Sequence, residues 1–313
     1  MRLLFVWTGL TGYMADCWRA LQRRPGVELK VLVEGEGLGA GFSDAVMQGL
    51  DWERVAADAL TVVQIAAWRP DAIVVIGWRR KLSRLIAGAA ELECVPKFMQ
   101  MDMPWEWSLR KIAARFVLWR HCRRFRGILV HGERGARYAR WLGFAPEDIH
   151  RGCAAAVDLA RFAAARTDSP RTGFLFVGRK AAEKGLDFLR AGYARYREKG
   201  GTWALDVPEW IEPEQVPAAM AAHACLVLPS RREPFGMVVL EAIAAGMRTV
   251  VSDRVGARLE VPVDRVVRFG DAEALANALL AVERQGGGGA APDISFWDCR
   301  SWAERIASLC ANA

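Results

Sequence analysis

The sequence predicts an α/β protein built on doubly wound parallel sheets. Short apolar runs of the kind that form strands buried on both faces recur along the chain, and stretches with helical periodicity separate them. This alternation is typical of parallel sheets covered by helices. A length of 313 residues is enough for two domains, each with its own core.

The first half of the chain supplies most of the predicted strands. After the first strand and before its helix at residues 13–23, Gly9 and Gly12 allow the backbone to approach a ligand closely. The loop is too short for a dinucleotide fingerprint, and an ordinary strand-to-helix turn explains it equally well. Strands are expected at residues 3–7, 28–33, 72–77, 97–101 and 128–131 and near 149.

The segment from 224 to 253 concentrates polar groups between two buried strands. We expect strands at 224–228 and 249–252, a helix at 237–245, and a helix-ending glycine at Gly246. Glu241 is the one charged residue between Phe235 and Met247, and a carboxylate in a buried helix needs hydrogen-bond donors. A ribose diol supplies two such hydrogen-bond donors. Glu233 lies eight positions earlier, at the carboxyl end of a strand where α/β sheets bind ligands.

This segment, with its Glu-Pro-Phe-Gly and Leu-Glu-Ala motifs, resembles the donor site of the retaining GT-B glycosyltransferases of family 4. The resemblance implies two Rossmann-like domains facing a cleft. It also implies that Glu233 and the amides of Phe235 and Gly236 orient the donor sugar, while Glu241 holds the ribose. Pro234, Met237 and Val238 complete this part of the donor-binding set, and in the family the loop containing Gly12 faces the phosphates. The alternative is a buried unit in which Glu241 pairs with a neighbouring arginine.

A second motif begins the second domain. Gly178 and Arg179 follow a predicted strand at 174–177, and Lys184-Gly185 precedes a helix, as in the resembled family, where Gly178 also belongs to the donor site. The resemblance implies that Arg179 and Lys184 hold the diphosphate of the donor. Two fixed cations and helix amides stabilise the charge that a leaving diphosphate gains. An ordinary exposed turn is the alternative. No Asp-x-Asp metal motif occurs, so we expect no divalent ion and no cofactor besides the nucleotide sugar.

The chain departs from the family in several places. Between 203 and 225 only one helix, at 214–222, is expected, so the second domain and its base-recognition wall are abbreviated. Arg248 stands where the family has proline, and it either lengthens a turn or adds a cation near the donor sugar. No histidine follows the strand at 97–101. Asp102 is our candidate for the missing polar contact or an acceptor-activating base, and a turn-forming Asp before Pro104 explains it equally well. We interpret the four histidines as structural.

The domain organisation follows from the linker. Val157-Asp158 and a downstream Phe162 match the family linker, and a small, polar segment from 163 to 171 suits a hinge. We predict an acceptor-side domain at 1–168, a donor domain at 169–290, and a terminal helix in 291–313 that packs back on the first domain. Residues 36–44 are expected to form a glycine-rich loop on the acceptor side. Trp105 and Trp107 either stack on an acceptor or pack at the rim.

The segment from Ser108 to Arg126 is strongly basic and has apolar residues at helical spacing. An amphipathic helix of this kind suits an anionic membrane surface, and several family members dock in this way. We favour the alternative, a core-packed apolar stripe with a solvated basic face. The chain has no signal-peptide layout and no apolar run long enough for a membrane span, so we expect a cytoplasmic protein, with membrane association as the open alternative.

The function that these features favour is metal-independent transfer of a sugar from a nucleotide sugar to an acceptor hydroxyl, with retention at the anomeric carbon. A GT-B protein that binds nucleotide without turnover is the first alternative. A nucleic-acid-directed protein that uses the basic helix is the last, because the sequence contains no base-reading motif. The nucleotide base, the sugar and the acceptor are left open.

Overall fold

The computed structural model describes residues 1–35, 44–167, 169–288 and 292–313. These residues form two compact units, one of residues 1–157 with 296–313 and the other of residues 158–295. The predicted loop at 36–44 falls outside the described residues except for its last position. The predicted domain boundaries at 168 and at 290–291 also fall outside them.

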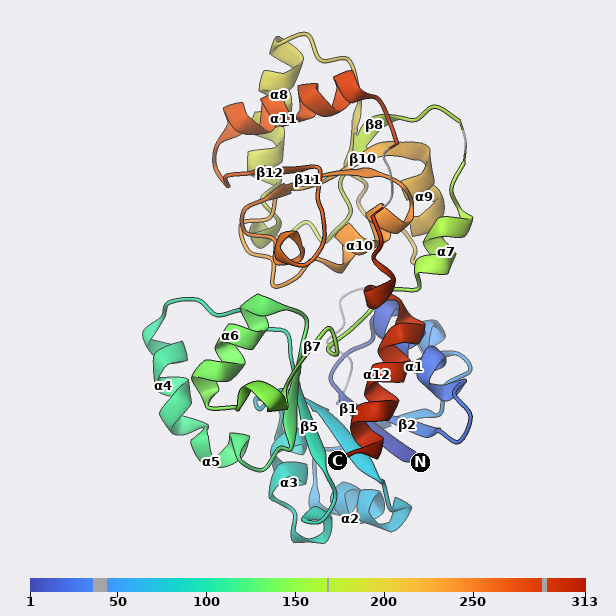
Figure 1. The fold of residues 1–313 in the computed structure, drawn as a ribbon, viewed down its shortest axis with the longest axis vertical. Helices are drawn as coiled ribbons and strands as arrows, with labels where there is room; N and C mark the ends of the chain where they lie inside the picture. The colour runs from blue at the N-terminus through green and yellow to red at the C-terminus, as the bar shows by residue number, and fades with distance from the viewer. Residues whose placement is uncertain (36–43, 168, 289–291) are drawn as a thin grey trace. The chain divides into compact units, whose positions relative to one another are not determined.

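The first unit is built on a seven-stranded parallel sheet (Figure 1). The order is β3-β2-β1-β4-β5-β6-β7, with β1 (Arg2–Trp7), β2 (Glu28–Glu34), β3 (Trp52–Val55), β4 (Ala72–Ile76), β5 (Lys97–Met101), β6 (Gly127–Val130) and β7 (Ile149–Arg151). Six of these strands confirm the prediction. The sequence did not predict β3, because Glu53 and Arg54 interrupt its apolar pattern and an edge strand need not be buried on both faces.

Helices cover this sheet. They are α1 (Gly12–Gln22), α2 (Ala59–Trp68), α3 (Lys81–Gly88), α4 (Leu109–Val117), α5 (Trp119–Cys122), α6 (Glu133–Leu142) and α12 (Cys299–Ala311), with single turns η1 (Asp44–Met47), η2 (Ala90–Leu92), η3 (Pro146–Asp148) and η6 (Ser295–Trp297). The terminal helix α12 packs along α1 (Figure 1). Trp302 on α12 is buried against Phe5, and its indole N–H donates to the carbonyl of Cys153 at 2.8 Å.

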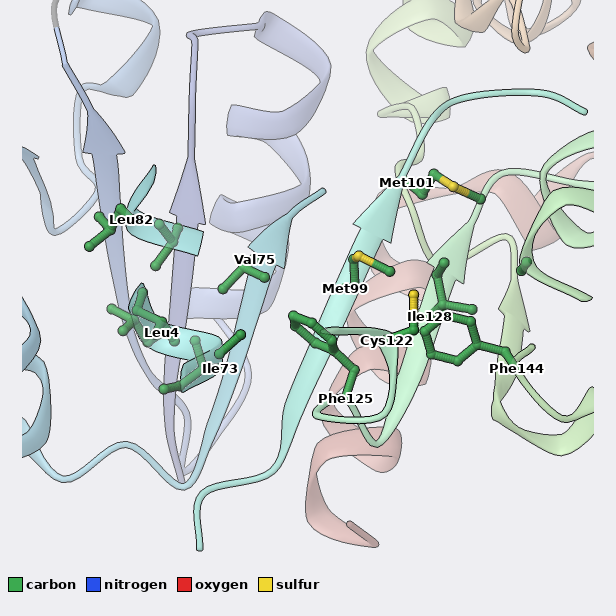
Figure 2. Close-up of a cluster of buried hydrophobic side chains, with 14 of the residues drawn as sticks. Leu4, Ile73, Val75, Leu82, Met99, Met101, Cys122, Phe125, Ile128 and Phe144 are labelled. Carbon is green, nitrogen blue, oxygen red and sulfur yellow. The ribbon is translucent and has the colours of Figure 1, made fainter. Parts of the chain in front are cut away.

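A continuous apolar core lies between this sheet and the helices on one of its faces. Figure 2 shows Leu4, Ile73 and Val75 from neighbouring strands in this cluster. Phe125 and Phe144, which come from the segments after α5 and α6, pack near Ile128 in the same view. The strand at 97–101 is buried along its whole length, as expected for a central strand of a parallel sheet.

Helix α4 contradicts the core-packed stripe that we favoured. None of its residues is buried, and Leu109, Phe116 and Val117 are 86%, 75% and 77% exposed. Lys111 lies on the inner side instead, with a side chain only 11% exposed that pairs with Glu106 at 3.1 Å. The helical spacing was predicted correctly, but the side of the helix that faces the domain was not.

The second unit contains a five-stranded parallel sheet of order β12-β11-β10-β8-β9. Its strands are β8 (Thr172–Leu175), β9 (Leu205–Asp206), β10 (His223–Leu228), β11 (Arg248–Ser252) and β12 (Arg265–Val267). Its helices are α7 (Leu159–Ala164), α8 (Leu186–Glu198), α9 (Val216–Ala222), α10 (Met237–Ala244) and α11 (Ala272–Gln285), with turns η4 (Ala182–Lys184) and η5 (Ala257–Leu259).

The segment from 203 to 225 is short, as expected, but it contains the two-residue strand β9 that the sequence did not predict. Strand β9 pairs with β8 at the edge of the sheet. Within the described ranges, none of the helices is both long and apolar enough to cross a bilayer.

Candidate functional site

The second unit has a topological switch point between β8 and β10. From β8 the chain continues outward to β9 on one side, and from β10 it continues to β11 and β12 on the other. All these neighbours are parallel, so the loops after β8, β10 and β11 meet at one edge of the sheet. Ligands of open α/β sheets bind at such a point. Both predicted donor motifs follow strands that border it.

Backbone hydrogen bonds join the two motifs. The carbonyl of Glu183 accepts from the amides of Arg231 and Arg232 at 2.8 and 3.1 Å. On the other side, the amide of Ala257 donates to the carbonyl of Phe235 at 2.8 Å, and Glu233 forms a parallel bridge with Val255. The loops after β8, β10 and β11 are therefore held together before any ligand binds.

Lys184 and Glu233, which are 49 positions apart, form an ion pair at the centre of these loops. The Nζ atom of Lys184 lies 2.5 Å from Oε2 of Glu233, and the two side chains are only 17% and 11% exposed. The hydroxyl of Ser230, which is buried, donates to the same carboxylate oxygen at 3.3 Å. Because both partners keep some solvent contact, removing one of them is expected to cost about 1–3 kcal/mol, below the roughly 3–5 kcal/mol lost when one partner of a fully buried pair is removed.

Two glycines are required by the geometry of these loops. Gly185 has φ +70°, and a Cβ atom there would lie 2.4 Å from the carbonyl oxygen of Pro229. Gly236 has φ +98°, and its Cβ would lie 3.2 Å from the side chains of Glu233, Leu228 and Val255. Only glycine adopts these φ values without strain and leaves room for the neighbouring loop. Gly185 therefore lets the first motif close over the second.

Arg179 is close to Lys184 in the sequence, but its side chain pairs with a different carboxylate. Its guanidinium forms an exposed ion pair with Glu183 at 3.2 Å. An exposed pair of this kind is worth only about 0.2–1 kcal/mol, so an incoming phosphate can replace it at little cost. Gly178 lies close to Lys184, because a Cβ atom built at Gly178 would be 3.8 Å from Cε of Lys184.

Helix α10 contributes its first turn and Glu241. The N–H groups of a first helical turn have no acceptor within the helix and favour anions or hydroxyls. Val239, Leu240 and Ile243 on α10 are buried, whereas Met237, Val238 and Glu241 share a partly exposed side. Glu241 is therefore only partly buried, whereas the sequence suggested that it lies inside a buried helix. Pro234 and Phe235 precede the helix.

Two predicted site residues belong to the first unit. Gly12 is the first residue of α1, directly after the loop that follows β1. Asp102 follows β5 and is exposed. Both lie at the carboxyl edge of the seven-stranded sheet, which is the ligand-binding edge of such sheets. Glu233, Lys184, Gly178 and Gly236 are brought together in the second unit.

His131, which we interpreted as structural from the sequence, is a neighbour of Asp102. Strands β5 and β6 pair Met101 with Val130, so Asp102 and His131 follow them side by side. Burial lowers the pKa of His131 to about 4, although the Asp102 carboxylate opposes this shift. The imidazole is therefore neutral near pH 7. The signal available from the sequence was that His131, like Asp102, directly follows a predicted strand.

Arg248 does not lie free near the donor motif. Its guanidinium pairs with Asp264 at 3.0 Å and donates to the carbonyl of Gly286 at 2.8 Å. It is the first residue of β11, so it neither lengthens the turn nor adds a cation near the donor sugar.

Ser230 is a further residue of the site that the sequence did not single out. Its hydrogen bond to Glu233 assigns it a positioning role.

Comparison with known proteins gave one match to a family model and several matches to solved structures. Residues 204–288, which include β10, α10 and both glutamates, match the family model described as Glycosyl transferases group 1. Comparison with curated protein sequences gave no match.

Similar solved structures include HepE from Anabaena in complex with UDP, at TM-score 0.76 and 15% identity over 100% of both chains. Sucrose-phosphate synthase from Thermosynechococcus elongatus follows at TM-score 0.71 and 16% identity, over 100% of this chain and 98% of that one. The lipopolysaccharide outer core galactosyltransferase WaaB in its apo form has TM-score 0.63 and 14% identity, over 100% and 99%. At sequence identities of 14–16%, the structural similarity shows a shared fold and nothing more. Residues 204–288 therefore match the glycosyl transferases group 1 model, and the chain as a whole has the GT-B fold.

Proposed function

We propose that this GT-B glycosyltransferase is a member of family 4 and transfers a sugar from a nucleotide sugar to an acceptor hydroxyl with retention of configuration. The observation that supports this most directly is the Lys184–Glu233 ion pair at the switch point of the second sheet. A cation and a carboxylate in contact can meet the two unlike parts of one donor, its diphosphate and its sugar hydroxyls.

In this proposal each donor group has a named partner. Lys184 and Arg179 bind the diphosphate and stabilise it as it leaves, while Glu233 turns to the sugar hydroxyls. Glu241 accepts from the ribose diol, on the partly exposed side of α10. The close approach of donor and backbone uses Gly178 and Gly236, with Pro234, Phe235, Met237 and Val238 completing the wall. Gly12 and Asp102 act from the first unit, with Asp102 contacting the sugar or acceptor.

Two features support a reaction without a divalent metal. The leaving diphosphate gains negative charge in the transition state, and the Lys184 ammonium, the Arg179 guanidinium and the first-turn amides of α10 supply fixed positive charge. The sequence has no Asp-x-Asp motif. Because HepE was solved with UDP and with UDP-glucose, uridine nucleotides are the first donors to test.

The test is turnover of a panel of nucleotide sugars, such as UDP-glucose, ADP-glucose and GDP-mannose, with and without EDTA. Release of nucleoside diphosphate is followed, and proton NMR assigns the anomeric configuration of the product. The proposal expects one preferred donor, a retained configuration and the same rate in EDTA. An inverted product or loss of activity in EDTA would contradict those two parts separately.

A protein that binds nucleotide without turnover is the second candidate. The observation in its favour is that no histidine follows β5, where Asp102 is found instead. Tight binding of a nucleoside diphosphate with no turnover of any nucleotide sugar would favour it.

We also propose an anionic membrane surface as a partner. The segment from Ser108 to Arg126 combines seven basic residues with exposed apolar side chains.

A further inference from the structure

Most of the large apolar side chains of helix α4 face away from the domain. Its inner side carries Ala114, which packs against the core, and Lys111, whose ammonium donates to the carbonyl of Pro104 and pairs with Glu106. Arg115 likewise donates to the carbonyl of Trp141. The apolar side chains of Leu109, Phe116 and Val117 face outward instead. Burying Lys111 and exposing three apolar side chains is unfavourable in water, which indicates that another apolar phase covers this face.

The exposed apolar face extends beyond the helix at both ends. Trp107 before α4 and Trp119 at the start of α5 are also exposed. A cavity of about 380 Å³ adjoins the face, and Trp119, Phe125 and Phe144 are among its lining residues. Arg115 and Arg123 also line it. Figure 1 shows α4 at the periphery of the first unit.

Positive charge surrounds this apolar face. Six arginines of the segment are exposed, namely Arg110, Arg115, Arg120, Arg123, Arg124 and Arg126. No aspartate or glutamate lies between Ser108 and Arg126. The guanidinium of Arg123 stacks over the ring of Trp119 at 5.0 Å, so cationic and aromatic groups lie together. The partner must therefore be apolar at its centre and anionic around it.

We propose that residues 107–126 dock on an anionic lipid bilayer, with α4 lying in the plane of the interface and its apolar side chains inserted. This inference deepens the proposed membrane contact and does not depend on which donor is used. Leu109, Phe116 and Val117 enter the boundary between headgroups and acyl chains, and Trp107 and Trp119 suit the headgroup level. The arginines contact lipid phosphates. A second copy of this chain fits less well, because two patches of the same charge would meet on a protein of net charge +7.

Vesicle binding of the full chain tests the proposal. The probes are vesicles of phosphatidylcholine with 30% phosphatidylglycerol and vesicles of phosphatidylcholine alone, assayed by sedimentation at low and high salt. The apolar variant is Leu109→Asn, Phe116→Asn, Val117→Asn, and the charge variant is Arg110→Gln, Arg120→Gln. The matched control is Leu60→Asn, Val63→Asn, because these apolar side chains are exposed on α2 of the same unit.

The proposal expects binding to phosphatidylglycerol vesicles that weakens at high salt. The apolar variant should bind at least about tenfold more weakly, equal to about 1.4 kcal/mol, and the charge variant should also lose affinity. The control should bind as the wild type does. Because all of these residues are exposed, circular dichroism and nucleotide-sugar turnover in detergent-free buffer should be unchanged in each variant.

Absence of vesicle binding by the wild type would overturn the proposal, as would equal losses in the apolar variant and the control. A concentration-dependent dimer that the apolar variant abolishes would assign the face to self-association instead. Nucleotide-sugar turnover is measured without vesicles, so its failure would concern the transfer chemistry and not the docking face.

Discussion

Replacing Lys184 by methionine should lower both the stability of the second unit and the rate of glycosyl transfer. The substitution keeps the length of the side chain and removes its charge. It leaves the Glu233 carboxylate, whose side chain is 11% exposed, without its nearest cation. The Ser230 hydroxyl at 3.3 Å stays in place and offsets part of the loss.

The magnitude follows from the burial of this pair. Removing one partner of a fully buried pair costs about 3–5 kcal/mol, and the remaining solvent contact here reduces the expected loss to about 1–3 kcal/mol. For the reaction, one fixed group that stabilises developing charge is worth about 2.7–4 kcal/mol, so kcat should fall by about 10²–10³. The two effects are measured separately, by urea unfolding and by initial rates at saturating donor.

A double-mutant cycle with Glu233→Gln isolates the pair. The coupling free energy between Lys184 and Glu233 in unfolding should be about 0.5–3 kcal/mol, because their side chains are in contact. Arg179→Met is the matched control, since its pair with Glu183 is exposed. It should change the unfolding free energy by no more than about 1 kcal/mol while still slowing transfer. A Lys184→Met variant that loses under about 0.5 kcal/mol and keeps kcat within threefold would refute the reasoning.

Three further predictions concern other parts of the chain. Gly185→Ala should lower the unfolding free energy by about 2 kcal/mol or more, since its Cβ meets the Pro229 carbonyl, whereas Gly270→Ala has a similar φ but open space and should cost only about 1 kcal/mol in urea unfolding; equal losses would argue against the close approach. Ser230→Ala should reduce kcat several-fold with little change in KM, because Ser230 positions Glu233, and Ser230→Thr should restore part of the rate; an effect on KM alone would contradict this role. The pKa of His131 is lowered from 6.5 to about 4, so between these pH values the unfolded chain binds more protons than the folded chain. The free energy of unfolding should therefore be highest above pH 6.5 and fall by about 1–3 kcal/mol as the pH drops toward 4. In thermal unfolding, His131→Asn should flatten this pH dependence, and an unchanged dependence would contradict the assignment.

The donor motif was predictable because local chemistry fixes it. A continuous apolar run gives β10, and the first turn of α10 follows directly from Gly236. The same reasoning located β1, β4 and β5, which are buried and uninterrupted. Roles within the motif rest on the family resemblance, and they remain predictions.

Features that depend on contacts between distant segments were not predictable. The ion pair joins Lys184 to a residue 49 positions away, and only the sheet order brings them together. The orientation of α4 was predicted wrongly, because helical spacing defines a stripe but not which side packs on the domain. His131 was passed over, although the pairing of β5 with β6 sets it beside Asp102.

Titration calorimetry of nucleoside diphosphates into the full chain in EDTA tests the central claim most directly. UDP, ADP and GDP are compared on the wild type, on Glu241→Ala, and on Arg179→Gln with Lys184→Gln. We predict that the wild type binds one of them in preference to the others, that Glu241→Ala weakens this binding by at least tenfold, and that the double variant weakens it further. Binding of none of the three, or affinity unaffected by both sets of substitutions, would contradict a donor site at this edge of the sheet.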